Sequence, residues 1–340
     1  PRRTTGSDDL DARIQILLDD LGVDGNRRVA QEILVSAFGV VRDIDDRLDL
    51  KIASAALYEL WDAFNTFAPY KDVKKVTVFG SARTRPDDPA YQLAKGLAAE
   101  LADDGWFIVT GAGPGIMLAA NEGAGREKSF GVNIQLPFEQ EANHFLHGDE
   151  KLVEMRYFFT RKLMLSKESS AFIALPGGFG TQDETLELLT LLQTGKAEPV
   201  PLVLLDVPGG TYWGRWDDYI RTELDDGGYI SSDDTDLYCL ATTVEQACAE
   251  VNGFWSNYHS QRYVGNHLVI RMQREVDDDL LTRINERCFD LVEEGGIFRT
   301  GPLGPEIDDA DSLELPRLAF RYNIRHYGNW RPLIDLINRA

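Results

Sequence analysis

The chain has 340 residues, of which 43% are apolar and 27% are charged. This balance is typical of a globular protein with one or two domains, and it excludes disordered, collagen-like and coiled-coil chains. The 35 basic and 56 acidic residues give a net charge of −21, which disfavours nucleic acid and anionic membranes as partners. A small anionic ligand is still compatible with this charge, because backbone amides bind phosphate whatever the net charge.

The segment 1–71 is predicted to be a helical extension. Three runs within residues 8–67 carry apolar side chains at helical spacing. Asn26 is placed to cap the second helix. The buried stripe of that helix is predicted to consist of Val29, Ile33, Leu34, Phe38 and Val41. No residue pattern in this extension points to chemistry.

Residues 72–250 alternate between short apolar strands and helices, and 151–168 is one of the segments predicted to be helical. The predicted strands are Val76–Phe79, Trp106–Thr110, Phe130–Leu136, Ala171–Leu175 and Pro201–Leu205. Nearly continuous apolar strands indicate a parallel sheet that is covered on both faces. We therefore expect a doubly wound, Rossmann-like α/β core with its ligand at the carboxyl ends of the strands.

The segment 251–340 is predicted to be a small α/β appendage. Alternating residues predict half-buried strands at Leu268–Met272 and Leu318–Tyr322. Between them we expect a helix over Leu280–Val292 and a polar acidic loop near Asp308–Asp311. A terminal helix closes the chain.

The cysteines and the first residues bear on the compartment. The three cysteines, Cys239, Cys248 and Cys288, are an odd number without close pairing, which favours buried thiols over disulfides or a zinc site. The first seven residues lack the apolar run of a signal peptide, and no segment has the ~18 apolar residues of a membrane span. We therefore expect a cytoplasmic protein.

Glycine-rich turns follow three of the predicted strands. They begin at Gly80, Gly111 and Gly177, and the second contains Gly113 and Gly115. One such turn is explained as well by tight chain reversal, but three at strand ends favour a nucleotide or phosphate site. The second turn departs from the dinucleotide fingerprint, because its third glycine comes one position early and residues 135–137 offer no acidic partner for a ribose. NAD is therefore disfavoured.

The motif Pro176–Glu184 carries the most specific signal. Gly178, Phe179, Gly180 and Thr181 would place unpaired amides, and a hydroxyl group, at the start of a helix where phosphate binds. Glu184 follows one turn later. Thr181 and Glu184 also match a capping box, in which the glutamate only bonds the backbone of the threonine. The double glycine and the strand end favour a functional site.

Two cations precede this motif on an otherwise apolar helix. Arg161 and Lys162 either extend to solvent as a snorkelling pair or reach the site. With Pro176-Gly177-Gly178-x-Gly180-Thr181-x-x-Glu184, they resemble the LONELY GUY (LOG) family of cytokinin-activating phosphoribohydrolases, once labelled lysine decarboxylases. The added terminal segments are similar to those of longer bacterial LOG-type proteins, often labelled AMP nucleosidases.

The resemblance implies hydrolysis of AMP or a cytokinin riboside 5′-monophosphate to free base and ribose 5-phosphate. It implies that Glu184 stabilises the ribosyl cation and orients water, while Arg161 stabilises the leaving base. The expected phosphate and substrate contacts are Ser81, Arg83, Gly111, Gly113, Gly115, Lys162, Gly177, Gly178, Phe179, Gly180 and Thr181. The family also implies a homodimer or higher homo-oligomer.

No cofactor or metal is predicted. His144, His147, Asp149 and Glu150 are interpreted as a solvated loop, and no lysine is in a context that suggests pyridoxal phosphate. Two alternatives to a hydrolase stay open. One is a nucleotide-binding sensor or carrier of the same fold without turnover, and the other is a regulatory protein that acts through its added segments.

Overall fold

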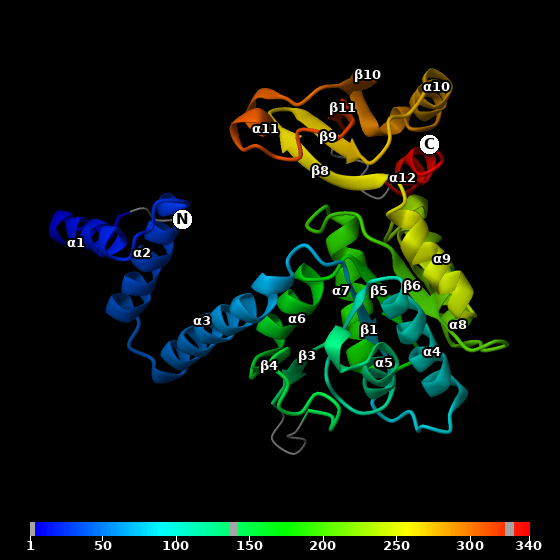
Figure 1. Ribbon diagram of the computed structural model, residues 1–340, viewed down its shortest axis with the longest axis horizontal. Coiled ribbons are helices and arrows are strands. Elements are labelled where there is room, and N and C mark those ends of the chain that lie inside the picture. The colour runs from blue at the N-terminus through cyan, green and yellow to red at the C-terminus, as the bar shows by residue number, and fades with distance from the viewer. Residues whose placement is uncertain (1–3, 136–141, 324–329) are drawn as a thin grey trace. The chain divides into compact units, whose positions relative to one another are not determined.

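The computed structural model describes residues 4–135, 142–323 and 330–340 (Figure 1). Its contacts divide the chain into two compact units, Pro1–Asn65 and Thr66–Ala340. The three-part division at residues 71 and 250 stays a prediction. None of the helices in the described ranges is long and apolar enough to cross a membrane.

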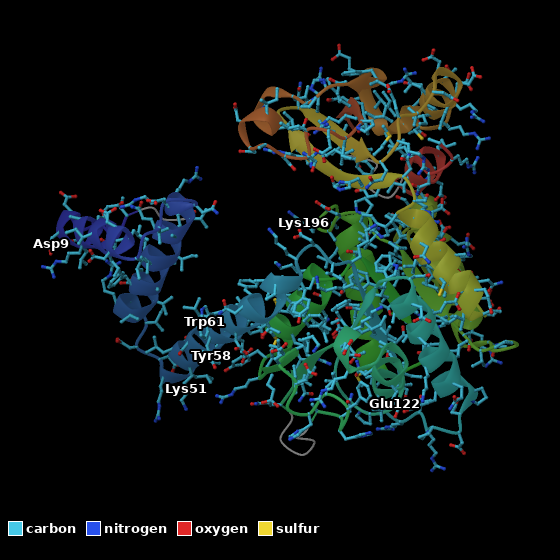
Figure 2. All side chains as sticks on the ribbon, in the orientation of Figure 1. Asp9, Lys51, Tyr58, Trp61, Glu122 and Lys196 are labelled. Atoms are coloured by element: carbon cyan, nitrogen blue, oxygen red, sulfur yellow. The ribbon has the colours of Figure 1, made fainter. Side chains whose placement is uncertain are left out.

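The first unit contains α1 (Asp8–Asp20), α2 (Arg27–Asp43) and most of α3 (Arg47–Phe67). Its small core is formed by Ile14 and Leu18 of α1 and Val35 of α2. On α3, the exposed rings of Tyr58 and Trp61 have centroids 5.8 Å apart (Figure 2).

Two predictions for this unit were wrong. Asn26 has a left-handed backbone (φ 53°) and makes no side-chain cap. Of the predicted buried stripe, only Leu34 packs partly against the core, and Val29, Ile33, Phe38 and Val41 are exposed. The reason is that α1 packs around Val35, so the buried face of α2 is narrower and rotated from the predicted one.

The second unit contains the expected parallel sheet, so the doubly wound Rossmann-like fold is confirmed. Its strand order is β4-β3-β2-β1-β5-β6-β7. The strands are β1 (Lys75–Phe79), β2 (Phe107–Thr110), β3 (Ser129–Ile134), β4 (Leu152–Met155), β5 (Ala171–Ala174), β6 (Leu202–Leu205) and β7 (Cys239–Ala241). From the central strands β1 and β5, successive strands are added toward the two opposite edges of the sheet. β1 and β5 are paired, with Phe79 opposite Ala174. Ligands bind at such a switch point.

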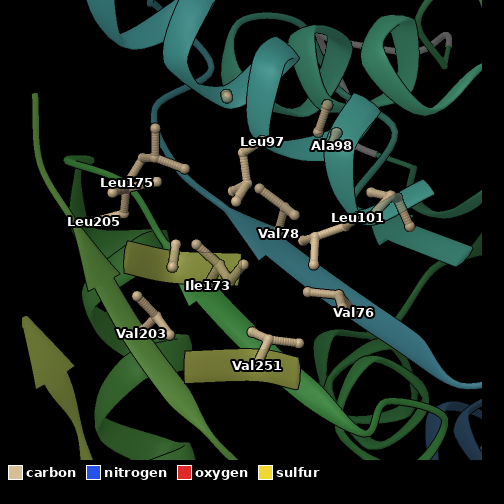
Figure 3. Packing of buried hydrophobic residues seen from close by; sticks show 14 of the residues in the cluster. Val76, Val78, Leu97, Ala98, Leu101, Ile173, Leu175, Val203, Leu205 and Val251 are labelled. Carbon is tan, nitrogen blue, oxygen red and sulfur yellow. The ribbon is translucent and has the colours of Figure 1, made fainter. Parts of the chain in front are cut away.

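Helices cover both faces of this sheet. They are α4 (Pro89–Asp103), α5 (Ile116–Ala124), α6 (Phe158–Lys167), α7 (Phe179–Gln193), α8 (Tyr212–Tyr219) and α9 (Val244–Phe254). Val76 and Val78 of β1 pack with Leu97 and Leu101 of α4 on one face (Figure 3). Thr77 points to the opposite face, because side chains alternate along a strand, and its hydroxyl donates to the Leu165 carbonyl of α6 at 3.2 Å.

The prediction of helix over 151–168 was wrong at its start. Leu152–Met155 forms the edge strand β4, whose Val153 and Met155 are buried while Glu154 is exposed. Four alternating residues are too few to distinguish a strand from a helix by period alone. The short strand β7 was not predicted. β3 ends at Ile134, and the predicted continuation to Leu136 lies outside the described residues.

A second, antiparallel sheet follows with strand order β10-β11-β9-β8. Its strands are β8 (Tyr258–Val264), β9 (His267–Met272), β10 (Val292–Thr300) and β11 (Arg317–Tyr322), accompanied by α10 (Asp278–Arg287), α11 (Gly304–Asp308) and α12 (Trp330–Ile337). The two predicted strands are confirmed as β9 and β11. The helix predicted to reach Val292 ends at Arg287, because Val292 begins β10. Neither β8 nor β10 was predicted.

Short helical turns complete the described chain. They are η1 (Ala68–Tyr70), η2 (Arg126–Lys128), η3 (Ile220–Asp225), η4 (Ser232–Leu237) and η5 (Phe289–Leu291). The loop predicted near Asp308–Asp311 starts at the end of α11.

Candidate active site

A cavity of about 880 Å³ lies at the carboxyl ends of β1, β2, β3 and β5. This size suits a small-molecule site. The predicted site residues in its wall are Ser81, Arg83, Gly111, Gly113, Arg161, Gly177, Gly178, Phe179, Gly180, Thr181 and Glu184. Four separate stretches of the sequence therefore meet at one place. Gly115 and Lys162 lie outside this wall.

The start of α7 presents unpaired backbone amides. The helix begins at Phe179, and Gly178 at its N-cap makes no side-chain cap. The first amide to bond within the helix is that of Gln182, which donates to the Gly178 carbonyl at 3.1 Å. The amides of residues 179–181 therefore have no intrahelical acceptor, and together with the helix dipole they favour an anion.

This helix start also decides between the two interpretations of Thr181 and Glu184. In a capping box, Thr181 would be the N-cap residue and would precede the first helical residue. Instead, Thr181 is the third residue of α7, and Glu184 lies well inside the helix. The capping-box interpretation is therefore excluded.

The glycine at 177 lets Thr181 lie close to the turn. A Cβ atom at residue 177 would be only 2.1 Å from Thr181 Oγ1. The Ser81 amide donates to the Pro176 carbonyl at 3.2 Å, which joins the turn after β1 to the turn after β5. The two turns thus form one continuous wall on which Thr181 and Ser81 supply hydroxyl groups.

Glu184 is a buried carboxyl group on this wall. Only 8% of the residue is exposed, and among the described residues its carboxyl group makes no hydrogen bond and no ion pair. Burial raises the pKa of Glu184 to about 7, although the positive charges of Lys162 and Arg161 act to lower it. A carboxyl group with this pKa can exchange a proton near neutral pH.

Arg161 reaches the same cavity from α6. Its Nε donates to the Val132 carbonyl of β3 at 2.9 Å, which orients the guanidinium group. Burial lowers the pKa of Arg161, and the charge of Glu184 acts in the opposite direction. A guanidinium group stays protonated in proteins, so the site contains a fixed cation close to Glu184.

Lys162 is not in the cavity wall and pairs with acidic residues of α7. Its Nζ lies 2.9 Å from Asp183 Oδ2 and also contacts Glu187 Oε2. Lys162 acts on the site through its charge, which lowers the pKa of Glu184. Its direct contact with phosphate stays a prediction.

A network of side chains holds the turn after β2. The Ala112 amide donates to Thr110 Oγ1 at 3.0 Å, and Asn143 Nδ2 donates to the Gly113 carbonyl at 3.1 Å. Gly115 lies at the N-cap of α5, outside the cavity wall. These bonds fix the glycine turn without placing a side chain in the cavity.

Sequence reasoning missed several lining residues, namely Met117, Asn133, Ile134, Phe158, Gln182 and Tyr212. Tyr212 donates from its hydroxyl to the Gly177 carbonyl at 2.6 Å, and the same hydroxyl accepts from Gln182 Nε2 at 2.6 Å. For Tyr212, the available signal was its place at the start of the helix that follows the strand β6. For Asn133, the signal was a polar residue near the carboxyl end of an apolar strand.

In the segment that contains His144 and His147, Asp149 has a structural role. Asp149 accepts from Lys151 Nζ at 2.7 Å and from Arg126 Nε at 2.8 Å. In the described part of the chain, no group of three histidine, cysteine or acidic side chains is arranged to hold a metal ion.

Comparison with known proteins identifies relatives of this core. The model of a family described as possible lysine decarboxylase matches residues 117–251. The cytokinin riboside 5′-monophosphate phosphoribohydrolase of Mycobacterium marinum is 30% identical over 177 residues, which cover 50% of this chain and 89% of that protein. The enzyme of that name from Oryza sativa subsp. japonica, LOG, is 28% identical over 219 residues, which cover 62% of this chain and 84% of that protein.

Among solved structures, the molybdenum cofactor carrier protein of Chlamydomonas reinhardtii is similar over 53% of this chain and 96% of its own, with 23% identity and a TM-score of 0.37. The identity and coverage of the phosphoribohydrolase from Mycobacterium marinum are sufficient to assign the family. The chain therefore belongs to the LONELY GUY (LOG) family.

Proposed function

We propose that this protein hydrolyses the N-glycosidic bond of nucleoside 5′-monophosphates and releases free base and ribose 5-phosphate. The observation that carries the proposal is the buried, unpaired carboxyl group of Glu184, located one turn beyond the open start of α7. A site that only binds phosphate needs no such carboxyl group. The names of the relatives support this class of reaction.

In this proposal, the 5′-phosphate binds at the start of α7. The amides of residues 179–181 and the Thr181 hydroxyl donate to its oxygens, and the helix dipole favours its charge. Ser81 and Arg83 reach it from the turn after β1. Binding energy from the phosphate, which does not itself react, positions the scissile bond at C1′.

Glu184 acts on the sugar and on water. As the bond between C1′ and the base nitrogen breaks, its electron pair goes to the base and positive charge develops on the ribose. The carboxylate stabilises that charge and accepts a proton from the water whose oxygen attacks C1′. A pKa of about 7 makes the proton acceptor strong enough to do this and still ionised above neutral pH.

Arg161 acts on the leaving base. Its buried guanidinium group is held by the Val132 carbonyl and lies beside the turn after β2. A fixed cation in a site with little water stabilises the negative charge that the departing base acquires. Glu184 and Arg161 therefore stabilise opposite charges of the same transition state.

We also propose that the protein forms a homo-oligomer. The rings of Phe159 on α6 and Phe179 on α7 are 54% and 96% exposed. In this proposal, the two side chains lie in the contact between copies of the chain, which would cover them. Sedimentation of the purified chain tests this part of the proposal.

The central experiment is to incubate the protein with AMP or isopentenyl-AMP and to separate the products by chromatography. We expect free base and ribose 5-phosphate in equal amounts. A Glu184→Gln variant run in parallel controls for contaminating hydrolases. Tight binding of nucleotide without base release would instead support a sensor or carrier.

A further inference from the structure

The side-chain amide nitrogen of Asn133, in the cavity wall, is buried without a hydrogen-bond partner among the described residues. Asn133 lies near the carboxyl end of β3 and is 6% exposed. Its Nδ2 atom is buried and has no acceptor among the described residues. Buried amide groups are nearly always paired, so an unpaired one in the wall of a ligand site suggests a partner that arrives with the ligand.

Several apolar side chains share the cavity wall with Asn133. Met117, Ile134 and Phe158 line the same cavity. Arg161 is anchored next to Asn133 in the chain, because its Nε donates to the carbonyl of the adjacent Val132 at 2.9 Å. Asn133 therefore adds a hydrogen-bonding group to a wall whose apolar side chains suit a flat ring.

The strand order indicates which part of a nucleotide would reach Asn133. The proposed phosphate site follows β5, and β3 lies three strands away in the order β5-β1-β2-β3, a separation of about 14 Å. Arg161 lies between, beside Gly111 at the end of β2. With phosphate at one end and ribose near Glu184, the part that extends toward β3 is the base.

We propose that Asn133 hydrogen-bonds the base and makes the site selective for purines with an amino group at position 6. This inference rests on the proposed function. A carboxamide has one donor end and one acceptor end, which match the adjacent amino group and ring N7 of adenine. A 6-oxopurine presents two acceptors at these positions. The terminal torsion of asparagine is broad, so either end can turn toward the cavity.

The test compares wild type with Asn133→Leu, which has similar volume and no polar atoms. Calorimetry measures the dissociation constants of AMP, IMP and purine riboside 5′-monophosphate, which lacks the amino group, with Glu184→Gln present in both proteins so that no nucleotide is hydrolysed. We expect wild type to favour AMP, and the variant to bind AMP roughly 10- to 100-fold more weakly with little change for the other two. The melting temperature should stay the same or rise, because the variant removes an unpaired buried group.

Glu154→Gln is the matched control. Glu154 pairs with Asn133 across β3 and β4 but is exposed on the edge strand. This variant should keep the wild-type preference among the three nucleotides. A loss of preference in both variants would overturn the assignment to Asn133.

Other outcomes also overturn the inference. Equal binding of AMP and IMP by wild type would do so, as would an unchanged preference in Asn133→Leu. A uniform loss of binding together with a lower melting temperature would show a structural role. Because binding is measured separately from base release, selective binding without turnover would refute the hydrolase and still support the role of Asn133.

Discussion

The guanidinium group of Arg161 occupies the space that any side chain at Gly111 would need. A Cβ atom at residue 111 would lie 2.1 Å from Arg161 Nη2, well inside van der Waals contact. The glycine after β2 therefore gives room to a cation from α6, while the bond from Arg161 to Val132 holds that cation at the edge of the sheet. The contact with Arg161 therefore explains why residue 111 is glycine, which the neighbouring sequence does not.

Gly111→Ala should displace Arg161 and slow base release. Even a shift of about 1 Å in a positioned group can reduce a rate by about 100-fold, so we expect a fall of ten- to 100-fold in kcat/KM. Steady-state assays with AMP measure it. Gly253→Ala on α9 is the control, because its Cβ atom would meet no atom within 4 Å. Unchanged kinetics in Gly111→Ala would show that Arg161 does not act on the leaving base.

Glu184→Gln should abolish base release and stabilise the fold at alkaline pH. Burial raises the pKa of Glu184 from 4.5 to about 7, so above pH 7 the ionised carboxylate destabilises the folded chain by about 3 kcal/mol. This cost declines as the pH falls below 7 and is gone below about 4.5, where the group is protonated in both states. The neutral glutamine of the variant does not have this free-energy cost at any pH.

Urea unfolding of wild type and Glu184→Gln at about pH 8 and about pH 5 measures this difference. The gain in unfolding free energy should be large at the higher pH and small at the lower one. A variant less stable than wild type at pH 8 would indicate that the carboxylate has a stabilising partner in the folded state.

The pH profile of kcat/KM should report Glu184 and its neighbour Lys162. Activity should fall on the acid side of pH 7, because protonation removes the carboxylate. Lys162→Met removes a charge that lowers the pKa of Glu184, so the acid limb should move to higher pH. Lys167→Met, on the same helix, is the control and should leave the limb in place. If the acid limb of the profile did not move in Lys162→Met, the charge of Lys162 would have no effect on the group that titrates.

Glu306→Ala should destabilise the second sheet without changing the site. The buried Glu306 carboxylate accepts from Arg271 Nη2 at 2.7 Å and from Arg317 Nε at 3.2 Å. Its removal leaves buried cations without their shared partner, at a cost of about 3 to 5 kcal/mol. Hydrogen exchange should show earlier opening of β9 and β11, while base release below the unfolding transition stays unchanged.

The control for this change is Glu293→Ala, which removes an exposed partner of Arg321. We expect it to alter stability by less than about 1 kcal/mol. If both variants unfolded at the wild-type temperature, the buried ion cluster would not stabilise this sheet.

Local patterns were sufficient to predict the parallel core and most of the cavity. Apolar strands such as Val76–Phe79 and the glycine turns after them specify conformation within a few residues, so their sequence alone was sufficient to predict the Rossmann-like fold and the glycine turn that precedes α7. Glu184 was found for the same reason, since its distance from Thr181 along a helix is a property of the sequence.

Only the tertiary structure decided the features that depend on where a helix or strand begins and on which segments pack against it. Whether Thr181 caps α7 depends on a shift of three residues in the helix start, which neighbouring turns decide. The exposed face of α2, the edge strand Leu152–Met155, and the meeting of Arg161 with Gly111 all depend on contacts between distant segments. Sequence spacing carries no information about such contacts, because their free energy arises only when the chain has folded and the segments exclude water together.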